Sequence, residues 1–205
     1  YGRLRTTAIN TSMRLCGSRF GRSAIRAGGS GVVLDDELRD VVRANLALLR
    51  HDGAIMDECF EAARSVRHRL IGVGTVSTEL AAQLGLVGMA ARSAGVAIDA
   101  RTGSVYDRHA LASCTRPTGD CWARAQLRIA EITASLDWLD GVVAEPVTFH
   151  KARGVVAALA PSQLAIAVVE GWRGEVVHRV ETGPAGQLLH YKVQDPSPRN
   201  RMGLA

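Results

Sequence analysis

The stretch EGWRGEVVHRV, residues 170–180, holds the charges best suited to a reaction site. Arg173 follows an unbroken apolar run and stands between a tryptophan and a glycine, and Glu175 comes two residues later. A fixed guanidinium stabilises negative charge, and a neighbouring carboxylate can hold it in place. On a strand, however, residues two apart share a face, so the two side chains also fit an ordinary salt bridge. The residues alone leave both interpretations open.

Asp120 and Arg124 form a second candidate pair. They stand four residues apart at the start of a strongly periodic segment, where a helix would bring them onto one face. Asp120 is also a good N-cap for that helix. Capping and a surface ion pair therefore explain these residues as well as a functional role does.

Histidine and cysteine, the usual ligands of transition metals, do not cluster in this sequence. His178 and His190 fall on two predicted strands of a hairpin and could lie near each other, but two histidines need a third ligand. The cysteines form no CxxC pair. The sequence also lacks a phosphate-binding glycine loop and a nucleophile elbow. We therefore predict no metal site in this segment. The four cysteines are Cys16, Cys59, Cys114 and Cys121.

The secondary structure predicted around these residues is mainly helical. Residues 34–145 read as a helical core, and Asp35 can cap its first helix. Gly53 is unfavourable inside a helix, so this stretch forms either one long helix or a tight pair of helices with a kink or break at Gly53. Ser77 can cap the first of two short helices, and the clearest helix follows Asp120. Residues 19–33 form a glycine-rich loop.

Short strands follow at residues 163–195. Two of them flank GPAG, which is typical of a β hairpin. Residues 99–118 and 146–162 read as a loop and a linker. Helices first and a small sheet last predict an α+β fold, with a helix bundle and a small C-terminal antiparallel hairpin or sheet. We interpret residues 1–205 as one partial domain.

Composition and charge limit the classes of function. The chain has 205 residues, of which 47% are hydrophobic and 22% charged, as in globular proteins. Its net charge is +5, and six arginines precede residue 30 without an acid among them. Aromatics make up 4%, too few for a base-stacking platform, so we predict a partner-facing surface and no nucleic-acid partner. No secretory signal or bilayer-spanning stretch is visible, and the chain reads as a piece of a longer protein.

Four ordered stretches together resemble one family. They are LIGVGTVSTELAAQLGLVGMAARSAGVAIDAR, GDCWARAQLRIAEI, VVEGWRGEVVHRVE and LLHYKVQDPSPRN. They are similar to the large subunit of the group 4 membrane-associated nickel-iron hydrogenases of the formate hydrogenlyase type, which is homologous to the 49-kDa subunit of respiratory complex I. The resemblance implies a hydrogenase-like helix bundle. It also implies electron transfer to protons or quinone in a complex at the inner face of the membrane, with iron-sulfur clusters in a small subunit.

The resemblance also assigns site residues. Gly28 and Gly29 match a loop that lies beside the active cavity, with Ala27 where proline is usual. Asp99 and Arg101 match a pair that orders the cavity region, and Asp120 and Arg124 match a charged pair on a core helix. In WRGE, Arg173 matches a cation placed over the metal or beside the quinone cavity, with Glu175 as its neighbour; these two are the candidate catalytic residues.

The departures from the family concern the metal. The hydrogenases hold nickel and iron with two CxxC pairs, and neither pair occurs here. The resemblance therefore implies no cofactor in this segment, and a nickel-iron centre only if the parent carries these cysteines elsewhere. The alternative is a non-catalytic scaffold subunit that docks an iron-sulfur partner through its arginine-rich front.

Overall fold

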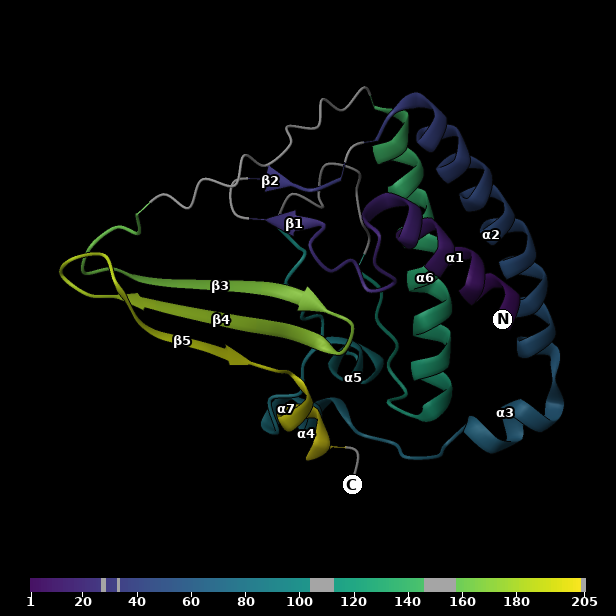
Figure 1. The fold of residues 1–205 in the computed structure, drawn as a ribbon. Helices are drawn as coiled ribbons and strands as arrows, with labels where there is room; N and C mark the ends of the chain where they lie inside the picture. Colours follow the sequence, from purple (N-terminus) through teal and green to yellow (C-terminus); the bar gives the residue numbers. More distant parts are fainter. Residues whose placement is uncertain (27–28, 33, 104–112, 146–157, 204–205) are drawn as a thin grey trace. The chain divides into compact units, whose positions relative to one another are not determined.

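The structure is a computed structural model that describes residues 1–26, 29–32, 34–103, 113–145 and 158–203 (Figure 1). The chain falls into two compact units. The first comprises residues 1–63 and 135–157, and the second comprises residues 64–134 and 158–205. The prediction of a single partial domain stays a prediction.

Helices dominate the first unit. It contains α1 (Gly2–Cys16), α2 (Asp36–Ala62) and the last part of α6 (Cys121–Ala144), with a two-stranded ladder of β1 (Ile25–Arg26) and β2 (Gly29–Ser30). As predicted, Asp35 caps α2 by accepting a hydrogen bond from the backbone N–H of Leu38 at 2.8 Å. The helix then runs through Gly53 without a break, so of the two predicted alternatives the single long helix is the one observed. It ends at Ala62, and the backbone of its C-cap, Ala63, is extended.

The core of the first unit joins α2 to the end of α6. Val42, Leu46, Leu136 and Val143 are buried together. Polar contacts flank this core. Arg39 donates to the carbonyl oxygens of Val143 and Glu145 at 2.6 and 2.8 Å, which satisfies carbonyls that the end of α6 leaves without helical partners.

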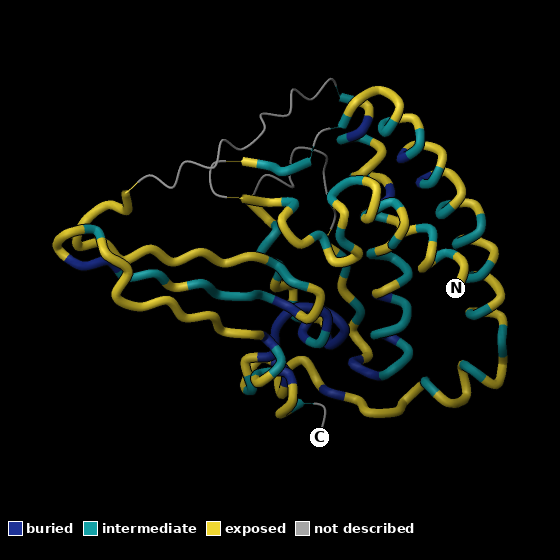
Figure 2. Tube along the Cα trace, viewed as in Figure 1, coloured by how far each residue is buried: buried dark blue, intermediate teal, exposed yellow. Residues whose placement is uncertain are grey.

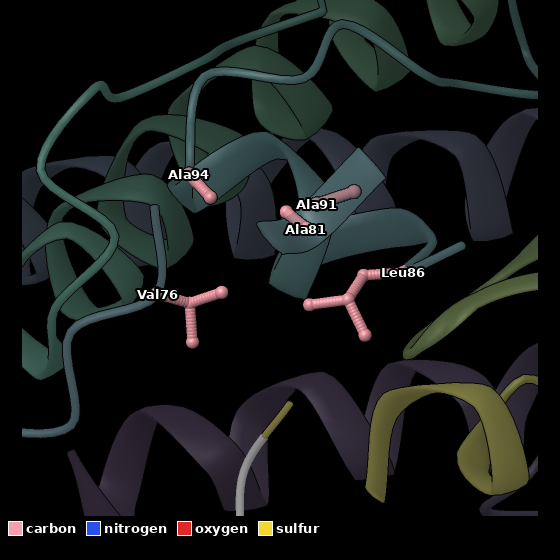
Figure 3. Close-up of a cluster of buried hydrophobic side chains, with 5 residues drawn as sticks. All are labelled: Val76, Ala81, Leu86, Ala91 and Ala94. Carbon is pink, nitrogen blue, oxygen red and sulfur yellow. The ribbon is translucent and has the colours of Figure 1, made fainter. Parts of the chain in front are cut away.

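The second unit begins with short helices. These are α3 (Arg64–Leu70), α4 (Thr78–Gln83) and α5 (Gly88–Ser93), followed by the first part of α6. The two predicted short helices are thus confirmed, and Ser77 caps α4 by accepting from the N–H of Leu80. Their core is small, because alanines bring the helices close together (Figure 3). It consists of Val76, Ala81, Leu86, Ala91 and Ala94.

An antiparallel sheet completes the second unit. Its strands β3 (Leu164–Gly171), β4 (Gly174–Thr182) and β5 (Leu188–Gln194) lie in sequence order, followed by α7 (Ser197–Arg201). The hairpin around GPAG is confirmed, and the fold class is α+β. His178 pairs with Val193, and His190 pairs with Glu181. The two histidines therefore point to opposite faces of the sheet, and the expectation that they lie near each other is wrong.

Other expectations fall outside the described residues. They concern Gly28, residues 104–112 of the predicted loop at 99–118, and the greater part of the predicted linker. Among the described helices, none combines the length and the apolar character needed to cross a bilayer.

Candidate functional site

The turn between β3 and β4 carries Arg173 and is held by a buried amide. Asn200, on α7, donates from Nδ2 to the carbonyl oxygen of Arg173 at 2.7 Å and accepts at Oδ1 from the N–H of Val87 at 3.1 Å. Because Asn200 is 6% exposed, these bonds are shielded from water. One side chain thus ties the turn to the start of α5.

Two glycines let the turn approach α5. A Cβ on Gly88 would collide with the backbone of Gly174, and a Cβ on Gly174 would lie 2.7 Å from Cγ2 of Val87. Both residues have positive φ angles, of 59° and 131°, which favour glycine. The backbone of the Arg173 turn is therefore fixed by contacts that larger residues would prevent.

The side chain of Arg173 leaves this rigid turn for the surface. Residue 173 is exposed, and so is its neighbour Trp172, which lies under the guanidinium of Arg128 at 5.9 Å. Hydrogen bonds from Ser197, together with the charge of Arg173, lower the pKa of Asp195. The guanidinium of Arg173 therefore lies within electrostatic reach of that carboxylate.

Glu175 does not pair with Arg173. Its carboxylate accepts from Arg199 of α7 at 2.5 Å, so the expected neighbour of the catalytic candidate is bound elsewhere. This contact fastens the start of β4 to α7, the helix that also supplies Asn200. Glu175 thereby supports the turn from its β4 side.

A buried ionic cluster lies on the β3 side of the turn. Arg92, on α5, contacts three carboxylates: Glu170 at 3.0 Å, Asp99 at 3.4 Å, and Glu131 of α6. Arg101 binds Asp99 at 2.6 Å and Glu131 at 3.2 Å. Arg92, Asp99 and Glu170 have side chains at most 5% exposed. Among the described residues, the predicted pair Asp99 and Arg101 is thus part of a network of five charged side chains.

The cluster holds Asp99 firmly ionised. Burial alone would raise its pKa, but hydrogen bonds from Arg101 and the charge of Arg92 outweigh burial and lower the pKa to about 2. Glu170, the last acid of β3 before the turn, also accepts from the backbone N–H of Ala100 at 3.2 Å. The cluster therefore joins α5, the segment after it, α6 and the end of β3.

Asp120 and Arg124 serve the start of α6 without pairing with each other. Asp120 accepts from the N–H groups of Ala123 at 2.7 Å and Gly72 at 2.8 Å, and these bonds keep its pKa below the usual range although burial opposes them. Arg124 donates to the carbonyl oxygens of Gly119 and Gly74. The predicted cap is confirmed, and the predicted ion pair is replaced by bonds to the backbone.

The remaining site candidates are glycines of the first unit. Gly29 lies in β2 opposite Arg26, with a φ of 149° that favours glycine. Gly28 lies outside the described residues, so its cavity role stays a prediction.

The described residues contain no group of three or more histidines, cysteines or acids arranged to hold a metal. With no CxxC pair in the sequence, these residues do not fit a nickel-iron group. We therefore assign Arg173 no role that depends on a nickel-iron group.

Comparison with known families decides the relationship. Residues 2–202 match the family described as the respiratory-chain NADH dehydrogenase, 49 Kd subunit. The chain belongs to this family.

Curated proteins similar to this chain include subunits of a dehydrogenase and of a quinone oxidoreductase, and a hydrogenase. The chain is 30% identical over 190 residues to a subunit of the F(420)H(2) dehydrogenase of Methanosarcina mazei, covering 89% of this chain and 48% of that protein. It is 32% identical over 189 residues to a subunit of the NADH-quinone oxidoreductase of Carboxydothermus hydrogenoformans, covering 90% and 48%. It is 27% identical over 197 residues to the carbon monoxide-induced hydrogenase of Rhodospirillum rubrum, covering 93% and 54%.

This 49-kDa family chain thus spans about half the length of the curated relatives it matches. The resemblance found in its sequence is confirmed at the level of the family. The structure adds residues to the site that the motifs did not single out. They are Arg92, Glu131 and Glu170 of the cluster, and Arg199 and Asn200 of α7. Two features of the sequence could have indicated these residues. Arg92 interrupts a run of small apolar residues, and Glu170 ends an apolar strand.

Proposed function

We propose that these residues belong to the large subunit of a membrane-associated oxidoreductase complex that passes electrons to protons or to quinone. Membership of the 49-kDa family supports this proposal, as do relatives named as part of a quinone oxidoreductase and as a hydrogenase. The iron-sulfur small subunit, the inner face of the membrane and the choice of acceptor are parts of the proposal. Protons are the acceptor in a parent with nickel-iron cysteine pairs of the formate hydrogenlyase type, and quinone is the acceptor in a parent without them.

Arg173 is the proposed site-lining residue. The observation that supports it is its rigid backbone: Asn200 holds the carbonyl oxygen of Arg173, and the contact between Gly88 and Gly174 fixes the turn. A guanidinium presented from a fixed position can stabilise a negatively charged species without a reorganisation cost at the moment of reaction. Its nearby acid, Asp195, stays ionised and can orient it.

Substitution of Arg173 in the full complex tests this role. Arg173→Ala removes the charge, and we expect turnover to fall by about 10²-fold or more, the scale typical of a lost electrostatic stabiliser. Arg173→Lys keeps the charge without the planar fork and should restore part of the rate. The measurement is kcat and KM, with assembly followed by native gel.

Arg201→Ala serves as the matched control, because Arg201 is an exposed arginine of α7. It should leave both rate and assembly unchanged. Unchanged turnover in Arg173→Ala would contradict the catalytic role. A loss of assembly with normal turnover in the remaining complexes would support the scaffold alternative.

A further inference from the structure

The two faces of the β3–β4–β5 sheet differ in character. Residues paired directly across an antiparallel ladder lie on the same face, so the register sorts the side chains. One face, called here the apolar face, has two polar side chains near its middle, His178 and Tyr191, which bond to each other at 2.7 Å. Such a face suits the interior of the protein's own fold. Its other residues are Ala165, Ala167, Val169, Val176, Val180 and Val193.

The opposite face combines apolar and charged side chains, and is called here the mixed face. Leu164 and Ile166 of β3 are 55% and 62% exposed. Ile166 pairs with Arg179, which pairs in turn with Lys192. An apolar row on an edge strand therefore lies beside a cationic row, and Figure 2 shows β3 and β5 exposed over most of their length. The residues of the mixed face are Leu164, Ile166, Val168, Glu170, Glu175, Val177, Arg179, Glu181, His190, Lys192 and Gln194.

Near the Arg173 turn, the two acids of the mixed face are already bound, Glu170 by Arg92 and Glu175 by Arg199. Farther from the turn, the face has two fixed cations, Arg179 and Lys192, and one carboxylate, Glu181. Arg179 and Lys192 stand directly opposite each other, and like charges in this position repel. Glu181 is shared: its Oε2 lies 3.4 Å from Arg179 and 3.3 Å from His190. Within the described residues, no carboxylate pairs with Lys192. These four side chains line a hollow of about 140 Å³. Placing carboxylates there would relieve the repulsion.

We propose that the mixed face docks an acidic, amphipathic segment of another subunit. Apolar side chains of that segment would cover Leu164 and Ile166, while its carboxylates would pair with Arg179 and Lys192. Charge argues for a separate subunit, because apolar contacts bordered by charged groups are typical of interfaces between proteins, whereas a core rarely accepts unpaired cations. The inference rests on the proposed function only in that a complex supplies the partner.

Crosslinking of the purified, assembled complex tests the contact. A zero-length carbodiimide reagent joins lysine amines to neighbouring carboxylates, and mass spectrometry locates the joined residues. We expect Lys192 to be linked to an aspartate or glutamate of a different subunit. Links from Lys192 confined to its own polypeptide, or no link from Lys192, would overturn the proposal.

Charge reversal provides a second measurement. The double variant Arg179→Glu and Lys192→Glu should lower recovery of the subunit crosslinked at Lys192 at least fivefold, with the far-ultraviolet circular dichroism of the variant protein unchanged. Arg201→Glu, a reversal on exposed α7, is the matched control and should leave recovery unchanged. Full recovery in the double variant would overturn the docking inference. It would leave the proposed function standing, because that function is tested separately by the turnover of Arg173 variants.

Discussion

Glu170 and Glu175 face each other directly across the β3–β4 ladder, yet each binds a different arginine. Glu170 contacts Arg92 of α5, and Glu175 contacts Arg199 of α7. Two facing carboxylates would repel without these partners. These ion pairs attach α5 to the β3 end of the turn and α7 to its β4 end. Two ion pairs, one on each strand, therefore hold the turn that carries Arg173.

Removing Arg92 should destabilise the protein strongly. Arg92→Met leaves buried carboxylates without their cation, which typically costs about 3–5 kcal/mol of folding free energy. Urea denaturation of the purified protein measures the change. Arg179→Met, which removes an exposed arginine, should change stability by less than about 0.5 kcal/mol. A similar loss in both variants would show that the cluster has no special role.

Asn200 should affect both stability and activity through the turn. Asn200→Ala leaves the N–H of Val87 and the carbonyl of Arg173 without their partner, at a cost of about 1–3 kcal/mol. Asn200→Asp keeps an acceptor for Val87 but sets a carboxylate against the carbonyl, and should be no better. Thermal unfolding and turnover of the complex are the measurements. If either variant behaved as wild type, the amide would not hold the turn.

Low pH should lower the free energy of unfolding, because it protonates Asp99. Its pKa in the folded state is about 2, below the ordinary value of 3.8, so the unfolded chain binds the proton more readily. Its stabilising contribution is complete above about pH 4 and is lost as the pH falls through about 2. Denaturation between about pH 5 and pH 2 should show this loss. Asp99→Asn should lower stability at neutral pH and flatten this part of the pH profile; an unchanged slope would contradict the assignment.

Two glycine-to-alanine changes should have opposite effects. Gly174→Ala adds a methyl group against Val87 at a φ of 131°, so it should destabilise the protein by more than about 1 kcal/mol. Gly53→Ala lies inside α2 with no atom near the new methyl group, and should stabilise by up to about 1 kcal/mol. The pair of melting temperatures, relative to wild type, tests both signs at once.

Local chemistry in the sequence determined most of the elements. The caps at Asp35, Ser77 and Asp120 and the hairpin around GPAG depend on contacts between residues close in the chain, so periodicity and turn residues could locate them. The ordered motifs likewise placed the chain in its family. Gly53 shows the limit of this reasoning, because its local preference left both a continuous helix and a pair of helices open, and the structure has the continuous helix.

Which charged side chains pair with each other depends on the folded chain. Sequence spacing predicts that Arg173 pairs with Glu175 and that Asp120 pairs with Arg124. In the structure, Glu175 binds Arg199 instead, and Arg124 donates to backbone carbonyl oxygens. Arg92 and Glu170 are 78 residues apart and become partners in a buried site. An ion pair depends on distance in space, and the packing that brings these residues together is set by the whole unit. The sequence could therefore propose Arg173 as a candidate, whereas the support of its turn by Asn200 and the two glutamates became visible only in the fold.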